Sequence, residues 1–334
     1  MILVTGGTGL VGSHLLHELV KTDSHIRAII RTGSHPGSIL PLWKYYSADA
    51  ETLFKKIEWY STDLMNRAAI AEAINGWEKI FHCAGSVSFS RRRKNEIRET
   101  NIIMVRNLID ACLENNTGKF IHVSSVAAIA KPEGNGPADE SSGFPVKPGS
   151  LYAKSKTLGE LEVWRGISEG LNAVIVNPSV ILGPAVNKMG STMLFSSLRK
   201  GMSFYPSGST GFVDVRDVAG IMVRLADSDI SGERFVLNSA NMAYRELFTK
   251  ILSGYSRKPP KFRLSKTSAS LAALGEWFMT LFTGKEPRIT LATARSSASH
   301  HAYSAEKVRS TLGVTFRDID ETIRDTADYY RTSD

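Results

Sequence analysis

The residues just after the first apolar run most strictly limit how this chain can fold. Residues 2–5 read ILVT, and the turn GGTGLVG that follows leads into a helical pattern over residues 10–21. Gly6, Gly9 and Gly12 stand three residues apart. The first permits a tight turn, the second lets backbone N–H groups approach a pyrophosphate, and the third lets the helix lie close to the strand. Between a strand and a helix N-terminus, this spacing predicts a dinucleotide site.

Short extended runs and helical patterns then alternate along the first half of the chain. Strands are expected at residues 2–5, 26–30, 58–61, 79–84, 119–125 and 172–178, and helices at 10–21, 50–57, 66–74, 96–115 and 151–169. Such alternation indicates βαβ units and a parallel sheet. Right-handed crossovers then give a doubly wound fold. We therefore predict an α/β protein with a Rossmann-type doubly wound parallel sheet.

The alternation stops after Pro178, where Gly and Pro become frequent. The run RFVLN at 234–238 is a candidate strand that returns to the main sheet, and the patterns beyond it are mainly helical. We predict a dinucleotide-binding Rossmann domain of residues 1–178 plus about 212–238. The remaining residues, about 179–211 and 239–334, would form a smaller, mainly helical C-terminal domain that binds the substrate.

Composition and charge fit a protein that binds an anionic cofactor. Hydrophobic residues make up 42% of the chain and charged residues 22%, which is ordinary for a globular protein. The net charge is +8, and the densest basic run is SRRRKNEIR at 90–98. Neither interleaved aromatic residues nor a nucleic-acid motif accompanies this run. We interpret it as the solvated start of a helix and expect no nucleic-acid partner.

The cysteines and the ends of the chain indicate a cytoplasmic protein. Cys83 and Cys112 lie in apolar surroundings and form neither a disulfide framework nor a metal spacing. The pair His300–His301 lacks a third ligand, so no metal is expected. The N-terminus carries no signal-peptide pattern. The apolar stretch 268–282 is short for a membrane span and contains a glutamate. We interpret it as a buried or lid-like helix, with a membrane-surface helix as the alternative.

The end of the second expected strand bears on which dinucleotide binds. An acidic residue there would bind the ribose 2′-hydroxyl of NAD. Instead, AIIRTGSH ends this strand with Arg31, and no Asp or Glu lies nearby. A guanidinium pairs well with a 2′-phosphate and also stacks on adenine. We therefore favour NADP, while NAD stays possible if Arg31 only stacks.

The stretch LYAKSK at 151–156 places a phenol and an ammonium four residues apart on one face of the expected helix. Such pairs are also ordinary helix surface. However, the strand that ends in HVSS brings Ser124 or Ser125 to the carboxyl edge of the sheet, where open α/β sheets bind ligands. We expect the serine hydroxyl to hold a substrate oxygen and Tyr152 to exchange a proton with it. Lys156 would lower the pKa of Tyr152 and bind the nicotinamide ribose.

Taken together, these motifs resemble the extended short-chain dehydrogenase/reductases of the NAD-dependent epimerase/dehydratase type. The resemblance rests on TGGTGLVG at 5–12, VSSVAA at 123–128 and YAKSK at 152–156. Further similar segments are STDL at 61–64, FHCAG at 81–85, ETNIIMVRNLIDAC at 99–112, VNPSVILGP at 176–184 and FVDVRDVA at 212–219. The ordered set spans about residues 1–226. The segment AIIRTGS is most similar to dihydroflavonol-4-reductase-like members.

The resemblance implies roles for individual residues. Ser125 would be the catalytic serine, Tyr152 the acid/base and Lys156 the residue that tunes it. Asn101 would either support a proton-relay water or satisfy local backbone groups. The implied cofactor contacts are Gly6, Thr8, Gly9, Leu10, Val11, Gly12, Arg31, Asp63, Leu64, Cys83, Ala84, Gly85, Tyr152, Lys156, Pro178, Ser179 and Val180. Helices of this superfamily commonly pair across a two-fold axis, so the resemblance also makes a homodimer possible.

Within the superfamily, the pattern favours reduction of a ketone or aldehyde. Arg31 favours NADP, and Val126 and Ala127 stand where sugar dehydratases carry an Asp–Glu pair. Plant flavonoid reductases have an asparagine five positions after the catalytic serine, and Ala130 stands there, so flavonoid specificity is not expected. The expected substrate contacts are Ser86, Val87, Phe89, Ser125, Ala127 and Phe212. This mostly apolar set suits a modest hydrophobic carbonyl or hydroxyl compound.

Two other functions stay open. One is a nucleotide-sugar epimerase with tightly held NAD(P), for which Lys188, Arg199 and Arg216 would supply positive charge. The other is a non-catalytic dinucleotide-binding protein. The presence of both Tyr152 and Lys156 argues against the second.

Overall fold

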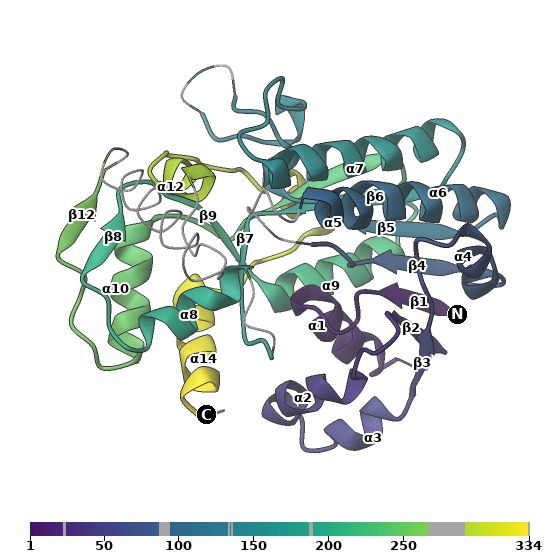
Figure 1. The fold of residues 1–334 in the computed structure, drawn as a ribbon, viewed down its shortest axis with the longest axis horizontal. Helices are drawn as coiled ribbons and strands as arrows, with labels where there is room; N and C mark the ends of the chain where they lie inside the picture. The colour runs from purple at the N-terminus through teal and green to yellow at the C-terminus, as the bar shows by residue number, and fades with distance from the viewer. Residues whose placement is uncertain are drawn as a thin grey trace.

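A seven-stranded parallel sheet forms the centre of the molecule (Figure 1). The computed structural model describes residues 1–22, 25–86, 94–132, 134, 136–186, 190–265, 267 and 291–332. The strand order is β10-β6-β5-β4-β1-β2-β3, and every neighbouring pair is parallel. The strands are β1 (Ile2–Thr5), β2 (Ile26–Ile30), β3 (Ile57–Ser61), β4 (Lys79–His82), β5 (Lys119–Val123), β6 (Ala173–Pro178) and β10 (Glu233–Leu237). The predicted Rossmann-type doubly wound fold is confirmed.

Helices cover both faces of this sheet. One face carries α1 (Leu10–Leu19), α2 (Leu40–Tyr46), α3 (Ala50–Phe54) and α9 (Val215–Ala226). The other face carries α4 (Arg67–Ile74), α6 (Met104–Glu114) and α7 (Leu151–Ser168). Because both faces are covered, the central strands are apolar along their whole length rather than in alternate positions. The fully buried run of β6 shows this pattern.

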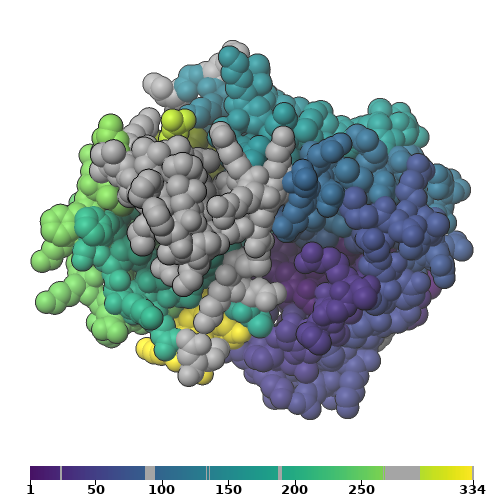
Figure 2. Space-filling model, in the orientation of Figure 1, coloured from purple at the N-terminus to yellow at the C-terminus, as the bar shows by residue number. Residues whose placement is uncertain are grey.

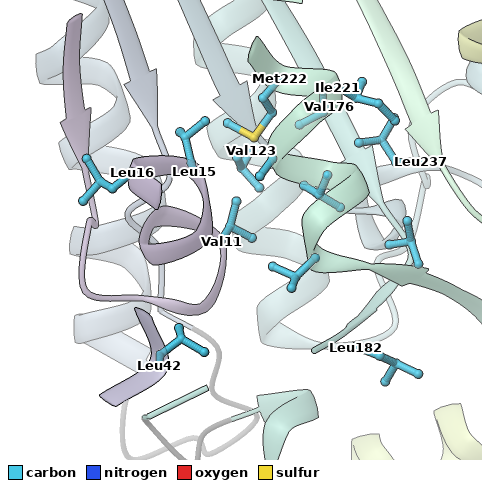
Figure 3. Close-up of a cluster of buried hydrophobic side chains, with 14 of the residues drawn as sticks. Val11, Leu15, Leu16, Leu42, Val123, Val176, Leu182, Ile221, Met222 and Leu237 are labelled. Atoms are coloured by element: carbon cyan, nitrogen blue, oxygen red, sulfur yellow. The ribbon is translucent and has the colours of Figure 1, made fainter. Parts of the chain in front are cut away.

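The core on the α1 side joins the N-terminal and C-terminal halves of the chain. Figure 3 shows Val11 and Leu15 of α1 near Val123 of β5 and Met222 of α9. Leu15 and Met222 are completely buried. Side chains in these strands alternate between the two faces, so Val4 belongs to this core and its neighbour Leu3 to the opposite one. The core thus holds α1, with the glycine turn that precedes it, in a fixed position.

The C-terminal elements form two small sheets and several helices beside the main sheet (Figure 1). The sheets consist of β7 (Val180–Leu182), β9 (Ser209–Asp214) and β11 (Ala240–Ala243), and of β8 (Phe204–Pro206) and β12 (Phe262–Leu264). The helices are α8 (Met193–Leu198), α10 (Tyr244–Gly254), α12 (Leu291–Ser297), α13 (Glu306–Leu312) and α14 (Ile319–Thr332). None of the helices that the structure describes has the length and apolar character needed to cross a bilayer. The stretch 268–282 lies outside the described residues.

The expected return of the chain to the main sheet occurs at β10, which pairs with β6. The expected Rossmann segment began at about residue 212, within β9. In the structure β9 pairs with β7 and β11 in a small sheet and not with the main sheet. The division into two domains stays a prediction.

Two local features differ from the sequence expectation. The single helix expected at 96–115 consists of α5 (Lys94–Arg98), a wider π-helical turn at Glu99–Ile103, and α6. Short 3-10 turns also occur at Pro36–Ile39, Val126–Ala128, Glu140–Ser142 and Gly190–Thr192. The helix α2 was not expected, and it is held by the buried ring of Trp43, whose Nε1 donates to the carbonyl of Ser13 at 3.0 Å.

Candidate active site

A large cleft runs along the carboxyl ends of β1, β4, β5 and β6 and continues toward the C-terminal elements. Its volume of about 3240 Å³ is several times that of a typical small-molecule pocket. One cleft therefore has room for a dinucleotide and a second molecule. The sequence-predicted residues that line it are Gly6, Thr8, Gly9, Leu10, Val11, Arg31, Asp63, Leu64, Cys83, Ala84, Gly85, Ser86, Ser125, Ala127, Tyr152, Lys156, Pro178, Ser179 and Val180.

Two of the three spaced glycines, Gly6 and Gly12, sit where no other residue fits. Gly6 has φ 72°, and a Cβ there would lie 2.6 Å from the backbone nitrogen of Ala84. A Cβ on Gly12 would lie 2.2 Å from the carbonyl oxygen of Gly6. Gly12 does not line the cleft but lets α1 start directly beneath it. Gly9 is the N-cap of α1 and has no side chain, so the first N–H groups of the helix face the cleft uncovered. This geometry fits a pyrophosphate.

The far end of the cleft is formed by the residues that follow β2 and β3. Arg31 is exposed directly after β2, and Ser34 lines the cleft beside it. Asp63 and Leu64 line it from the β3 side, where Asp63 accepts a hydrogen bond from the backbone of Met65 at 2.9 Å. The sequence from residue 25 to residue 40 contains no acidic residue. The segment that contains β2 therefore supplies no carboxylate to pair with the guanidinium of Arg31.

Ser125 and Tyr152 meet in the middle of the cleft. Ser125 follows β5, and its hydroxyl accepts a hydrogen bond from the backbone of Ala127 at 3.1 Å. Tyr152 is in the first turn of α7, which begins at Ser150 as a side-chain N-cap. Burial raises the pKa of Tyr152, and a hydrogen bond with Ser125 lowers it in part. The neighbouring Ser124 hydroxyl donates instead to Glu160 in the interior, so of the two candidates Ser125 is the serine beside Tyr152.

Lys156 lies one turn after Tyr152 and is buried at the back of the cleft. Its Nζ donates to the carbonyl of Val123 at 3.0 Å. Burial lowers the pKa of Lys156 to about 8, and the nearby Glu160 carboxylate opposes that change. We expected Lys156 to lower the pKa of Tyr152, whereas in this structure Ser125 is the group that does so. A Cβ on Gly85 would lie 3.3 Å from Nζ, so this glycine leaves the amine room in the cleft.

A buried carboxylate supports this arrangement from below. Glu160 is completely buried one turn after Lys156 and accepts hydrogen bonds from Ser124, from Asn177 at 2.7 Å and from Arg234 of β10 at 3.1 Å. Arg234 also donates to the carbonyl of Glu140 at 2.7 Å. Both side chains are buried, and their opposite charges compensate one another. They connect α7, β5, β6 and β10 beneath the catalytic side chains.

Asn101 is buried within the π-helical turn and has all its side-chain groups engaged. Its Oδ1 accepts from the backbone N–H of Ser86 at 2.8 Å, while Nδ2 donates to the carbonyl of Ser86 at 2.9 Å and to Ser155 Oγ at 3.0 Å. These hydrogen bonds to the backbone of Ser86 agree with the second of the two expected roles, and support of a proton-relay water stays a prediction. Asn101 thereby fixes the start of the segment after β4, where Ser86 lines the cleft.

The substrate end of the cleft differs from the sequence prediction in one residue. Phe212 is completely buried, and its ring packs edge-on against Tyr244 with centroids 6.2 Å apart, so it does not line the cleft as expected. Ser86 and Ala127 line the cleft. Val87 and Phe89 lie outside the described residues.

Sequence reasoning missed many lining residues of the C-terminal half, among them Tyr244, Phe248, His301 and Tyr303. Burial raises the pKa of both Tyr244 and Tyr303 to about 12, so each phenol stays protonated at neutral pH. These residues reach the cleft through pairings between distant segments, such as the bridge between Ala138 and Tyr303. No local sequence pattern marks such contacts.

The positive charges considered for a nucleotide-sugar site lie elsewhere. Arg216 pairs with Asp214 at 2.6 Å and with Asp325 at 2.7 Å, and it does not line the cleft. Arg199 donates to the carbonyl of Tyr330 at 3.2 Å and also lies outside the lining. Lys188 is outside the described residues. The cations that do line the substrate half are Lys131, Lys147, Lys200 and Arg295.

Comparison with known proteins places this geometry in a family. The pattern of the family described as "NAD dependent epimerase/dehydratase family" matches residues 2–237. A putative dihydroflavonol 4-reductase of Synechocystis is 26% identical over 335 residues, which cover 98% of this chain and 94% of that protein. The crystal structure of gox2253 superposes with a TM-score of 0.82 and 29% identity, covering 100% of this chain and 98% of that one. The UDP-glucose 4-epimerase of Thermotoga maritima superposes with a TM-score of 0.77 at 19% identity, covering 99% of each chain.

The family match spans well over half of the chain and contains the glycine turn, Ser125, Tyr152 and Lys156. The chain therefore belongs to the NAD dependent epimerase/dehydratase family, within the extended short-chain dehydrogenase/reductase superfamily, and is an NAD(P)-dependent oxidoreductase.

Proposed function

We propose that the protein is an NADP-dependent reductase of a hydrophobic ketone or aldehyde. The observation that carries this proposal is the hydrogen-bonded pair of Ser125 and Tyr152 in the cleft, with the ammonium of Lys156 one helical turn away. These three groups suit proton transfer at a substrate oxygen. The exposed Arg31, which stands in a segment (residues 25–40) that contains no acidic residue, supports NADP rather than NAD.

The side chains have distinct tasks in this proposal. Ser125 donates a hydrogen bond to the substrate oxygen and so holds it beside the phenol of Tyr152. Tyr152 gives its proton to that oxygen in reduction and takes it back in oxidation. The elevated pKa of Tyr152 keeps the phenol protonated at neutral pH, which suits the reductive direction. A bound nicotinamide supplies the hydride that the substrate carbon receives.

The walls of the substrate half support an apolar substrate. Met193, Leu194, Phe204, Pro206 and Phe248 line this region. A pocket with apolar walls and a few convergent polar groups favours a hydrophobic compound with one reactive oxygen. The similarity to a putative dihydroflavonol 4-reductase agrees with a carbonyl substrate.

The test is NADPH oxidation by the full chain across a panel of hydrophobic ketones and aldehydes. We expect turnover of at least one member, and a loss of at least about a hundredfold in kcat for Tyr152→Phe, because the phenyl ring has no proton to give. Tyr60→Phe is the matched control, because Tyr60 of β3 undergoes the same change but does not line the cleft. Full activity of Tyr152→Phe would show that the proton comes from elsewhere.

One observation favours the epimerase alternative, namely the cations Lys131, Lys147, Lys200 and Arg295 in the substrate half. A thermal-shift titration with UDP-sugars and GDP-sugars distinguishes the two functions. Under the reductase proposal these sugars leave the melting temperature unchanged. A large stabilisation by one of them, without NADPH oxidation of any carbonyl, would favour the epimerase.

A further inference from the structure

The small sheet of β8 and β12 carries apolar side chains that face solvent. In its parallel register Phe204 lies opposite Phe262, with ring centroids 5.5 Å apart. The two side chains are 49% and 57% exposed, and Met202, two residues before Phe204, is 37% exposed. These three residues form what we call the apolar patch. They include both of the exposed phenylalanines in the described part of the chain.

Cations surround this patch without acidic partners. Lys200, Arg257, Lys258, Lys261 and Arg263 are all exposed, and they belong to segments 200–206 and 256–264, which contain no Asp or Glu. Lys261 and Arg263 directly flank Phe262. Arg257 donates to the carbonyl of Arg199 at 3.2 Å, which ties the two segments together. None of the five forms an ion pair with a carboxylate of the described residues.

The combination of exposed aromatic rings and unpaired cations matches one kind of surface. Phenylalanine and methionine enter the boundary between lipid headgroups and acyl chains, while Lys and Arg around them remain at the headgroups. Anionic lipids attract such cations, by about fivefold in affinity for each one near the surface. A nucleic acid would need hydrogen-bonding groups, which the patch itself lacks. We propose that this surface docks the protein on an anionic phospholipid bilayer.

The position of the patch gives docking a consequence for the cleft. Pro206 and Leu264 lie on the same face of the small sheet, two residues beyond the paired phenylalanines, and both line the cleft. Met202 and Phe204 of the patch line the mouth of the cleft as well, so apolar side chains continue from the exposed patch into the substrate half. Under the proposed function, a hydrophobic carbonyl dissolved in the bilayer would enter by this route. Docking itself does not depend on that function.

The patch also lies clear of the dinucleotide end. The green β8 and β12 form the left edge of the molecule in Figure 1, and green atoms project at the same edge in Figure 2, away from the purple N-terminal elements. A bilayer at this edge would leave Arg31 and the glycine turn accessible to a cofactor in water.

The test is co-sedimentation of the full chain with two kinds of vesicle, phosphatidylcholine alone and equal parts of phosphatidylcholine and phosphatidylglycerol. We expect binding to the anionic vesicles only, weakened by high salt. The double variants Phe204→Ala/Phe262→Ala and Lys258→Glu/Lys261→Glu should each weaken vesicle binding by at least about tenfold. Binding requires no turnover, so this result is separable from the activity assay.

Two matched controls distinguish the effect of the patch from the effect of removing cations or apolar side chains elsewhere on the surface. Lys55→Glu/Lys56→Glu removes two exposed cations near α3, and Leu161→Ala removes an exposed apolar side chain of α7 that is 42% exposed. Both should bind vesicles like the unaltered protein. Circular dichroism and the melting temperature check that each variant is folded.

Several outcomes would overturn the proposal. Equal binding to both kinds of vesicle, or unchanged binding of the two patch variants, would show that the patch does not dock the protein on an anionic bilayer. If the patch variants convert a dimer into a monomer in lipid-free ultracentrifugation, the occupant is a second copy of the chain. If the patch binds duplex DNA or RNA more tightly than the anionic vesicles, the partner is a nucleic acid.

Discussion

Arg31 is the residue on which the choice between the two dinucleotides depends. It follows β2 directly and lines the cleft, and no acidic residue lies near it in sequence. A charge-assisted hydrogen bond of this type contributes about 1.5–3 kcal/mol, or roughly a tenfold to hundredfold change in affinity. We therefore expect Arg31 to set the ratio of kcat/KM for NADPH to kcat/KM for NADH.

We expect Arg31→Asp to lower kcat/KM for NADPH at least about tenfold relative to that for NADH, because the carboxylate repels a 2′-phosphate and can bind a 2′-hydroxyl. The measurement is kcat/KM with each cofactor for the same carbonyl substrate. Arg331→Asp, on the exposed end of α14, is the control and should leave the ratio unchanged. An unchanged ratio in Arg31→Asp would mean that this arginine does not contact the 2′-position.

At the scale of elements, what the sequence predicts well is what depends on local spacing. The glycine turn between β1 and α1 and the pair Tyr152 and Lys156 on α7 follow from three- and four-residue intervals along one element. The choice of Ser125 over Ser124 did not follow from spacing alone, because both residues end the same strand. The choice depends on Glu160, which accepts a hydrogen bond from the hydroxyl of Ser124 and so leaves Ser125 as the serine beside Tyr152.

The sequence did not predict elements that form by pairing between segments far apart in the chain. The sheet of β7, β9 and β11 joins segments up to about sixty residues apart, and the bridge from Ser209 to His300 joins still more distant ones. The sequence did not predict the π-helical turn at Glu99–Ile103 either. One extra residue in a helical turn hardly changes the spacing of the apolar residues from which a helix is predicted. These are the features that bring Tyr303 and Ser86 to the cleft.

Two helical glycines provide a direct test of how α7 is placed. Gly159 lies within α7, and a Cβ there would come 2.2 Å from the carbonyl oxygen of Asn101. Gly220 lies within α9, and a Cβ there would meet nothing within 4 Å. We expect Gly159→Ala to lower the free energy of unfolding by about 1–3 kcal/mol through overpacking. Gly220→Ala should raise it by about 0.5–1 kcal/mol, because alanine is the better helix former.

Urea denaturation at one pH measures both variants, and each serves as the other's control. If Gly159→Ala raises the free energy of unfolding as Gly220→Ala does, the close contact between α7 and the π-helical turn is contradicted. Activity adds a second reading, since the turn holds Asn101 and thereby Ser86. Only Gly159→Ala should also change KM.

The last helix is joined by polar contacts to α9, to the end of β9 and to Tyr45 of α2. Asp325 of α14 pairs with Arg216 of α9, and its backbone carbonyl accepts from Tyr45. Thr322 of α14 donates to the buried Asp214 at 2.8 Å. The substrate half of the cleft is therefore fixed to the dinucleotide half by polar contacts as well as by the shared core.

Three buried histidines make the stability of the whole molecule depend on pH. Burial lowers the pKa of His14 to about 4 and that of His82 to about 3, and it lowers the pKa of His122 well below its usual value. His82 and His122 stack with ring centroids 5.3 Å apart, and the described residues leave His82 Nε2 and both nitrogens of His122 without hydrogen-bond partners. All three are neutral in the folded protein at neutral pH.

The direction of the pH effect follows from these values. Below the unfolded pKa of about 6.5 the unfolded chain takes up protons on the three imidazoles, while the folded protein does not. The contribution to stability is therefore complete above about pH 6.5 and is lost as the pH falls toward the folded values. Each histidine accounts for about 1.4 kcal/mol per pH unit well below pH 6.5, so a fall to about pH 5.5 removes roughly 3–4 kcal/mol in all. That is a large part of the stability of an ordinary domain.

We expect urea denaturation at about pH 7.5 and about pH 5.5 to show this loss, and His122→Phe to reduce it by about 1 kcal/mol. Phenylalanine suits the position because His122 already stacks near Phe120, with centroids 6.4 Å apart, and it cannot take up a proton. His25→Gln is the control, because it removes an imidazole whose side chain is 58% exposed rather than buried. If His122→Phe loses as much stability on acidification as the unaltered protein, the acid sensitivity arises from the carboxylates, such as Asp214, and not from the buried imidazoles.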